Sequence, residues 1–205
     1  MPHKKFILGQ YFTRKLIAKK LVELLLKYAD CDRNVRILEP SFGKGSFIQV
    51  LKERGFMNIE GCEIDPKLTA KPSDFFDLPL ERKFELIIGN PPFTKFNLDG
   101  SYYYKERYAH KLPKPDEYLV NSLADKKRIR IENAFILKSL MHLKDEDSTI
   151  AFILPISFFI KNKYLRPKGR SFPYMKEMRF ICSNSFCIEP IDWASSFPLC
   201  AEMYV

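Results

Sequence analysis

The sequence lacks any long apolar run. No stretch of its 205 residues approaches the length and apolarity of a membrane span. The first five residues include two lysines and have no apolar core of the kind that a signal peptide needs. We therefore expect a cytoplasmic protein that does not associate with a membrane.

Cysteine and histidine are sparse and irregularly spaced. The five cysteines are an odd number, and the closest pair, Cys182 and Cys187, has no cysteine or histidine neighbour at the spacing of a zinc site. The three histidines are isolated from one another along the chain. These patterns predict reduced thiols and argue against a metal site.

Acidic residues are missing where basic residues gather. Residues 1–20 contain six lysines and arginines and no acid, and residues 161–179 contain seven against Glu177 alone. The formal net charge is +9. Two basic blocks indicate surfaces that could follow a polyanion, nucleic acid ahead of an anionic membrane. A solvated, lysine-rich surface explains the charge from composition alone equally well.

Short apolar runs alternate with helical patterns along the chain. Strands are predicted at residues 35–39, 59–64, 84–89 and 149–154, with further candidates near 179–190 and 199–205. Helices are predicted at residues 14–28, around 47–51, and at 131–143. This alternation is typical of an α/β fold with a doubly wound, mostly parallel sheet.

The first predicted helix has an apolar face and a candidate cap. Ile17, Leu21, Leu24 and Tyr28 recur at helical spacing, and Thr13 is a suitable N-cap. In contrast, residues 94–127 show no clear period, and we interpret them as a long loop or insertion. Their tyrosines could stack on unpaired bases, or the segment could simply pack as an insertion.

A glycine loop follows the first predicted strand. Gly43 and Gly45 lie just beyond Glu39, where ligands bind in open α/β sheets and where glycine allows the backbone to approach a cofactor. The spacing fits neither a P-loop nor the dinucleotide fingerprint. Glu63 ends the second strand, about 20 residues past the loop, where an acid can accept hydrogen bonds from ribose. Loop and acid together predict a nucleoside cofactor, although a tight turn beside a solvated acid is the alternative.

The sharpest motif follows the strand at 84–89 and reads Asn90-Pro91-Pro92-Phe93. An exocyclic amino group on adenine is a poor nucleophile because its lone pair is delocalised into the ring. The Asn90 side-chain oxygen and the Pro91 carbonyl could accept its hydrogens and stabilise the charge that develops during methylation. Consecutive prolines stiffen the turn, and Phe93 offers a face for an unstacked base.

The order of these motifs resembles that of gamma-class N6-adenine DNA methyltransferases of restriction–modification systems. The resemblance covers nearly the whole chain and depends on five segments: Gln10-Tyr11-Phe12-Thr13, Glu39-Pro40-Ser41-Phe42-Gly43-Lys44-Gly45, Glu63-Ile64-Asp65, Asp74-Phe75 and Asn90-Pro91-Pro92-Phe93. It implies a seven-stranded S-adenosylmethionine-dependent methyltransferase fold over residues 1–205, with a cofactor-binding half at about 1–80 and a catalytic, base-binding half at about 81–205.

The resemblance also implies roles for individual residues. S-adenosylmethionine would be held by Thr13, Glu39, Ser41, Gly43, Gly45, Glu63, Ile64, Asp74, Phe75 and Asn90. Within this set Glu63 would bind the ribose, and Asp74 with Phe75 the cofactor's adenine. A flipped target base would lie between Phe93 and Phe197, with Trp193 as a competitor for the second position.

The implied substrate is an adenine in double-stranded DNA. The family normally continues into a target-recognition domain, which we expect to be absent here, so that sequence specificity would come from a missing segment, from a partner subunit, or not at all. Two alternatives stay open: a methyltransferase acting on release-factor glutamine or structured RNA, and an inactive nucleic-acid-binding subunit of a larger complex.

Overall fold

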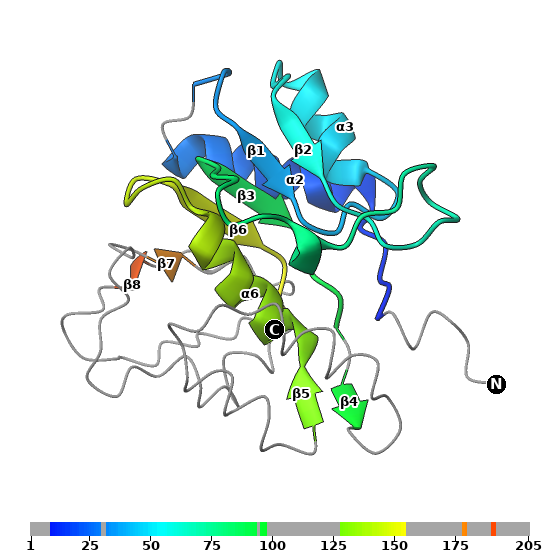
Figure 1. Ribbon diagram of the computed structural model, residues 1–205. Helices are drawn as coiled ribbons and strands as arrows, with labels where there is room; N and C mark the ends of the chain where they lie inside the picture. Colours follow the sequence, from blue (N-terminus) through cyan, green and yellow to red (C-terminus); the bar gives the residue numbers. More distant parts are fainter. Residues whose placement is uncertain are drawn as a thin grey trace, which may run out of the picture.

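A parallel sheet forms the centre of the molecule in the computed structural model, which describes residues 9–29, 32–93, 95–97, 128–154, 178–179 and 190–191 (Figure 1). Its strand order is β2-β1-β3-β6, and every neighbouring pair is parallel. The four strands are β1 (Ile37–Glu39), β2 (Ile59–Gly61), β3 (Leu86–Gly89) and β6 (Thr149–Phe152). They lie within the predicted strands and are shorter at one or both ends.

Helices cover both faces of this sheet (Figure 1). They are α2 (Lys15–Tyr28), α3 (Ser46–Glu53) and α6 (Ile131–His142). Successive residues of a strand point to opposite faces, so Ile37 packs in one apolar cluster with α2 and α3, while Leu38 packs in the other with α6. Two apolar layers on a parallel sheet confirm the doubly wound α/β prediction. The seven strands that the resemblance implies stay a prediction.

Helix α2 corrects two details of the prediction. Its buried apolar residues are Ala18, Leu21, Val22 and Leu25, whereas Ile17 is 44% exposed. The buried face is therefore rotated from the predicted one, and it packs in one apolar cluster with residues of α3. Arg14, and not Thr13, occupies the N-cap position, and no side chain caps the helix.

Two short antiparallel pairs lie outside the central sheet. Strand β4 (Lys95–Asn97) pairs with β5 (Arg128–Arg130), and β7 (Met178–Arg179) pairs with β8 (Pro190–Ile191). The segment predicted as a loop at 94–127 thus begins with a strand, and its residues 98–127 lie outside the described part of the chain. Across the described residues, none of the helices has the length and apolarity that crossing a membrane requires.

Helix α6 carries buried polar side chains that contact the loop after the 3-10 helix η1 (Phe75–Asp77). Lys138 Nζ donates to the Leu78 carbonyl at 2.9 Å. His142 is fully buried, and its Nδ1 lies 2.8 Å from the Arg82 carbonyl, which can only accept, so Nδ1 carries the proton. Aromatic packing completes this layer, in which the ring of Phe76 lies edge-on to that of Phe135 of α6.

The buried His142 predicts acid sensitivity. Burial, with Lys138 and Lys83 nearby, lowers its pKa from 6.5 to about 4. His142 in the unfolded chain therefore becomes protonated below pH 6.5, whereas in the folded chain it stays neutral down to about pH 4. The free energy of unfolding falls as the pH falls through this window. At about 1.4 kcal/mol per pH unit across this window, the expected loss is about 3 kcal/mol. Urea unfolding of His142→Phe at several pH values should show a shallower loss. Equal acid slopes in the two proteins would contradict the assignment.

Candidate functional site

The carboxyl ends of β1, β2 and β3 place the predicted residues at one edge of the sheet. Glu39 is the last residue of β1, Glu63 follows β2 by two positions, and Asn90 follows β3 directly. In a parallel sheet these ends share one edge, which is where open α/β sheets bind ligands. The fold therefore brings together residues that are far apart in the sequence.

The glycine loop (residues 40–45) depends on backbone conformations that glycine adopts most easily. Gly43 and Gly45 have φ angles of 55° and 75°, in the left-handed region. Gly45 then caps the start of α3. The Gly43 N–H donates to Glu63 Oε2 at 2.8 Å, and the Phe42 N–H donates to the Cys62 carbonyl at 3.0 Å. These bonds fix the loop against the end of β2.

An extended segment at residues 9–13, hereafter the N-terminal segment, crosses this edge of the sheet. Gln10 Nε2 donates to Asp65 Oδ2 at 3.0 Å, and the Thr13 carbonyl accepts from Ser46 Oγ at 2.7 Å. The Phe93 N–H donates to the Gly9 carbonyl at 3.3 Å. The N-terminal segment therefore connects the loops that follow all three strands.

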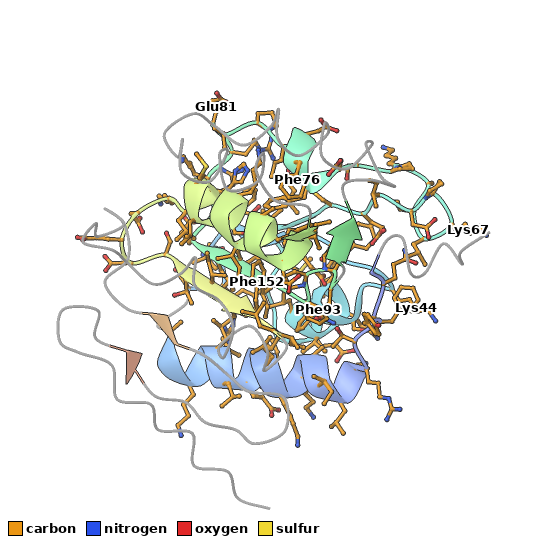
Figure 2. The ribbon with its side chains drawn as sticks, turned by 90° about the horizontal axis from the view of Figure 1, so that it is seen from below. Lys44, Lys67, Phe76, Glu81, Phe93 and Phe152 are labelled. Atoms are coloured by element: carbon orange, nitrogen blue, oxygen red, sulfur yellow. The ribbon has the colours of Figure 1, made fainter. Side chains whose placement is uncertain are left out.

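A pocket, hereafter the site pocket, lies between these pieces. Its walls come from residues 11–13, from residues between Glu39 and Phe47, and from Asn90. The open space is about 260 Å³. Lys44 lies at its rim with Nζ 4.9 Å from the centre of the Phe12 ring, and it extends toward solvent (Figure 2). The pocket thus combines one acid, backbone of the glycine loop and the amide of Asn90.

Glu39 is the acid in the site pocket. Its side chain is 1% exposed, and Oε2 has no hydrogen-bond partner among the described residues. Burial raises its pKa well above 4.5, the nearby charge of Glu63 adds to this, and the backbone N–H of Ile48 opposes it. A buried carboxylate with a free acceptor is suited to binding a cation, which would supply the missing partner.

The two ends of the Asn90 side-chain amide differ in their hydrogen bonding. Its Nδ2 donates to the Tyr11 carbonyl at 3.0 Å and to Thr13 Oγ1 at 3.1 Å. Its Oδ1 is buried and has no hydrogen-bond partner among the described residues. Leaving a buried acceptor unpaired costs about 1–3 kcal/mol, so an incoming N–H donor would be favoured at this atom.

Aromatic rings lie beside Asn90. Phe93 is half-buried, and its ring centre is 6.3 Å from that of Tyr11, which is 60% exposed. Pro91 and Pro92 lie between Asn90 and Phe93 in the chain, and Pro91 is buried whereas Pro92 is half-buried. An amide acceptor, a rigid turn and an accessible ring therefore occur together, as the motif predicts.

The remaining predicted residues lie close by but outside the walls of the site pocket. Both Glu63 oxygens accept backbone N–H groups, from Gly43 and from Asp65. Asp74 accepts from the Phe76 N–H at the start of η1, and Phe75 is 2% exposed in the apolar core. The cofactor contacts predicted for Glu63, Ile64, Asp74 and Phe75 stay predictions. Phe197 and Trp193 lie outside the described residues.

Sequence reasoning missed the contacts of Gln10, Tyr11 and Ser46. The first two belong to the Gln10-Tyr11-Phe12-Thr13 motif, whose place in the ordered series was the available signal. No sequence signal pointed to Ser46, because its hydrogen bond to the Thr13 carbonyl joins residues 33 positions apart.

Residues 17–183 match the family of Eco57I restriction-modification methylases, and the chain belongs to this family. Among curated proteins, it is 34% identical over 160 residues to the type II methyltransferase M.HincII of Haemophilus influenzae, covering 76% of this chain and 29% of that protein. It is 27% identical over 171 residues to M.TthHB8I of Thermus thermophilus, covering 75% of this chain and 38% of that protein. The chain therefore spans about a third of the length of these relatives.

Among solved structures, the methyltransferase subunit of a type I restriction-modification system from Streptococcus thermophilus is similar to this chain. The two are 17% identical, the TM-score is 0.46, and the match covers 71% of this chain and 34% of the other.

Membership of a methylase family implies S-adenosylmethionine as the methyl donor. The site pocket fits this molecule in two respects. Among the described residues, Glu39 Oε2 has no hydrogen-bond partner, so it can accept from the ammonium group of the methionine part, and the left-handed glycines allow the backbone of the loop to approach the cofactor.

Proposed function

We propose that this chain is the catalytic core of a DNA methyltransferase that methylates the N6 amino group of adenine. The observation that carries the proposal is the Asn90 side chain at the edge of the site pocket, whose buried Oδ1 has no hydrogen-bond partner within the described part of the chain. An exocyclic amine is the kind of donor that this acceptor needs. The names of the relatives, which are restriction–modification methyltransferases, support DNA as the polymer.

The proposed chemistry uses few groups of the protein. S-adenosylmethionine supplies an electrophilic methyl group when it is bound. Asn90 Oδ1 and the Pro91 carbonyl accept the two hydrogens of the adenine amine, which favours a pyramidal nitrogen whose lone pair can attack. The same two oxygens stabilise the positive charge on nitrogen in the transition state. No general base has to act before the attack: the bond of the methyl carbon to sulfur would break as its bond to nitrogen forms, and one amine proton would then leave to solvent.

Access to the base requires that it leave the duplex. Phe93 lies next to the acceptors in the sequence and is half-buried, so one face of its ring can stack on a flipped base. Exposed basic side chains of α2, among them Lys15 and Lys19, can contact phosphates without reading sequence. Selection of the target sequence then belongs to a recognition domain or subunit beyond this catalytic core.

The test is transfer of radiolabelled methyl from S-adenosylmethionine to unmethylated duplex DNA, followed by digestion to nucleosides. We expect the label in N6-methyladenine, and more of it on duplexes with a mismatched adenine, since flipping such a base costs less. RNA and protein glutamine substrates serve as parallel arms. Label in cytosine, in RNA or in glutamine alone, or in no substrate, would overturn the proposal.

A further inference from the structure

The contacts of Asn90 determine which end of its amide faces the substrate. Nδ2 lies 3.0 Å from the Tyr11 carbonyl, and a backbone carbonyl accepts hydrogen bonds but cannot donate them. The NH₂ end of the amide must therefore face Tyr11, and Oδ1 must face the other way. Reversing the amide would place two oxygens against each other and would remove the acceptor that methyl transfer needs.

One hydrogen bond does not fix the plane of an amide, because the terminal torsion of asparagine is broad. Thr13 Oγ1 provides a second acceptor, 3.1 Å from the same nitrogen. An NH₂ group has two hydrogens, and each now has its own acceptor. The pair of bonds fixes both the direction and the plane of the amide.

Thr13 is itself held in place from two sides. Its carbonyl accepts from Ser46 Oγ at 2.7 Å at the start of α3, and α2 begins two residues after it. Gln10, in the same segment, donates to Asp65 beyond β2. The hydroxyl group therefore has a defined position relative to the sheet that carries Asn90.

We propose that Thr13 is a positioning residue for methyl transfer, acting through the orientation of the Asn90 amide. This inference rests on the proposed function. It differs from the cofactor contact that the family resemblance implies for Thr13, because it concerns the oxygen that accepts from Asn90. The hydroxyl proton stays available for a second bond on the pocket side.

The variants separate these two roles. Thr13→Val keeps the shape of the side chain but removes the acceptor, and Thr13→Ser restores it. Thr149→Val is the matched control, because Thr149 starts β6 at the opposite edge of the sheet from Asn90. We expect kcat at saturating S-adenosylmethionine to fall about 10-fold in Thr13→Val, to recover within about 3-fold in Thr13→Ser, and to stay unchanged in Thr149→Val.

A second readout needs neither cofactor nor substrate. The two side-chain NH₂ resonances of Asn90, assigned in a ¹⁵N–¹H spectrum by their loss in Asn90→Asp, should shift in Thr13→Val. Their exchange with solvent should also become faster, and Thr13→Ser should resemble the wild type. A residue that only held the cofactor would regain full kcat at saturating cofactor and would leave these resonances unmoved.

The outcomes distinguish the inference from the proposed function. Unchanged kcat together with unchanged Asn90 resonances in Thr13→Val would overturn the inference and leave adenine methylation standing. Failure of the wild type to methylate adenine would overturn the function, while the resonances would still decide whether Thr13 orients the amide.

Discussion

Asn90→Ala is expected to slow methyl transfer by roughly 100- to 1000-fold, the usual effect of losing one oriented group that stabilises a transition state. The removed Oδ1 is a buried acceptor at the site pocket that has no partner among the residues that the structure describes. Because this atom acts on the target amine, the affinity for S-adenosylmethionine should change little. Single-turnover rates with preformed cofactor complex measure the first quantity, and calorimetric titration measures the second.

Asn58→Ala is the matched control for this experiment. Asn58 lies just before β2, at the opposite end of the strands from Asn90, and its side-chain Nδ2 donates a long 3.5 Å bond to the Asn34 carbonyl. Its removal should leave the rate near that of the wild type. A rate for Asn90→Ala within threefold of the control would exclude Asn90 from the chemistry.

Glu39→Gln is expected to weaken S-adenosylmethionine binding while making the cofactor-free protein more stable at neutral pH. The lost charge–charge hydrogen bond corresponds to about 1.5–3 kcal/mol, or roughly a 10- to 150-fold higher Kd. Stability rises because the neutral amide avoids placing a charge in a buried position. A buried carboxylate that binds the cofactor's cation predicts both results together, so each measurement tests the same role.

The direction of the stability change follows from the raised pKa of Glu39. The unfolded chain loses this proton near pH 4.5, whereas the folded chain keeps it to higher pH. The stabilising effect of the bound proton is therefore complete below pH 4.5 and is lost as pH rises through the folded-state pKa. Glu39→Gln does not titrate and so avoids this loss of stability. Its free energy of unfolding should therefore exceed that of the wild type by an amount that grows with pH.

Thermal unfolding of the two proteins at several pH values tests this, with Glu81→Gln as control. Glu81 is exposed and lies at the outer edge of the molecule (Figure 2). The control should match the wild type in both Tm and cofactor affinity. If Glu39→Gln were less stable than the wild type at neutral pH, the carboxylate would have a partner that the proposed role does not include.

Local patterns predicted the central strand β3 well because it is a continuous apolar run. Leu86, Ile87 and Ile88 are all fully buried, as expected for a strand covered on both faces. The proline after Asn90 marked the end of β3, and with it the position of the acceptor. The edge of the sheet that carries the site could therefore be predicted from sequence alone.

The hydrogen bonds inside the site could not be predicted from sequence alone. Thr13 has the chemistry of a helix cap, and local rules assign its hydroxyl to the first turn of α2. In the fold that hydroxyl accepts instead from Asn90, which is 77 positions away. No local rule contains such a partner, because it exists only after the strands have been brought together.

The short spacer between the N-terminal segment and α2 determines where Thr13 lies relative to the core. Helix α2 is fixed in the core by Ala18, Leu21, Val22 and Leu25, and only the extended Arg14 separates it from Thr13. One inserted residue would lengthen this spacer by about 3.3 Å, which exceeds the tolerance of a hydrogen bond. Connecting loops on protein surfaces commonly tolerate insertions and deletions. Here a single insertion would separate the Thr13 hydroxyl from the Asn90 amide while leaving the sheet intact.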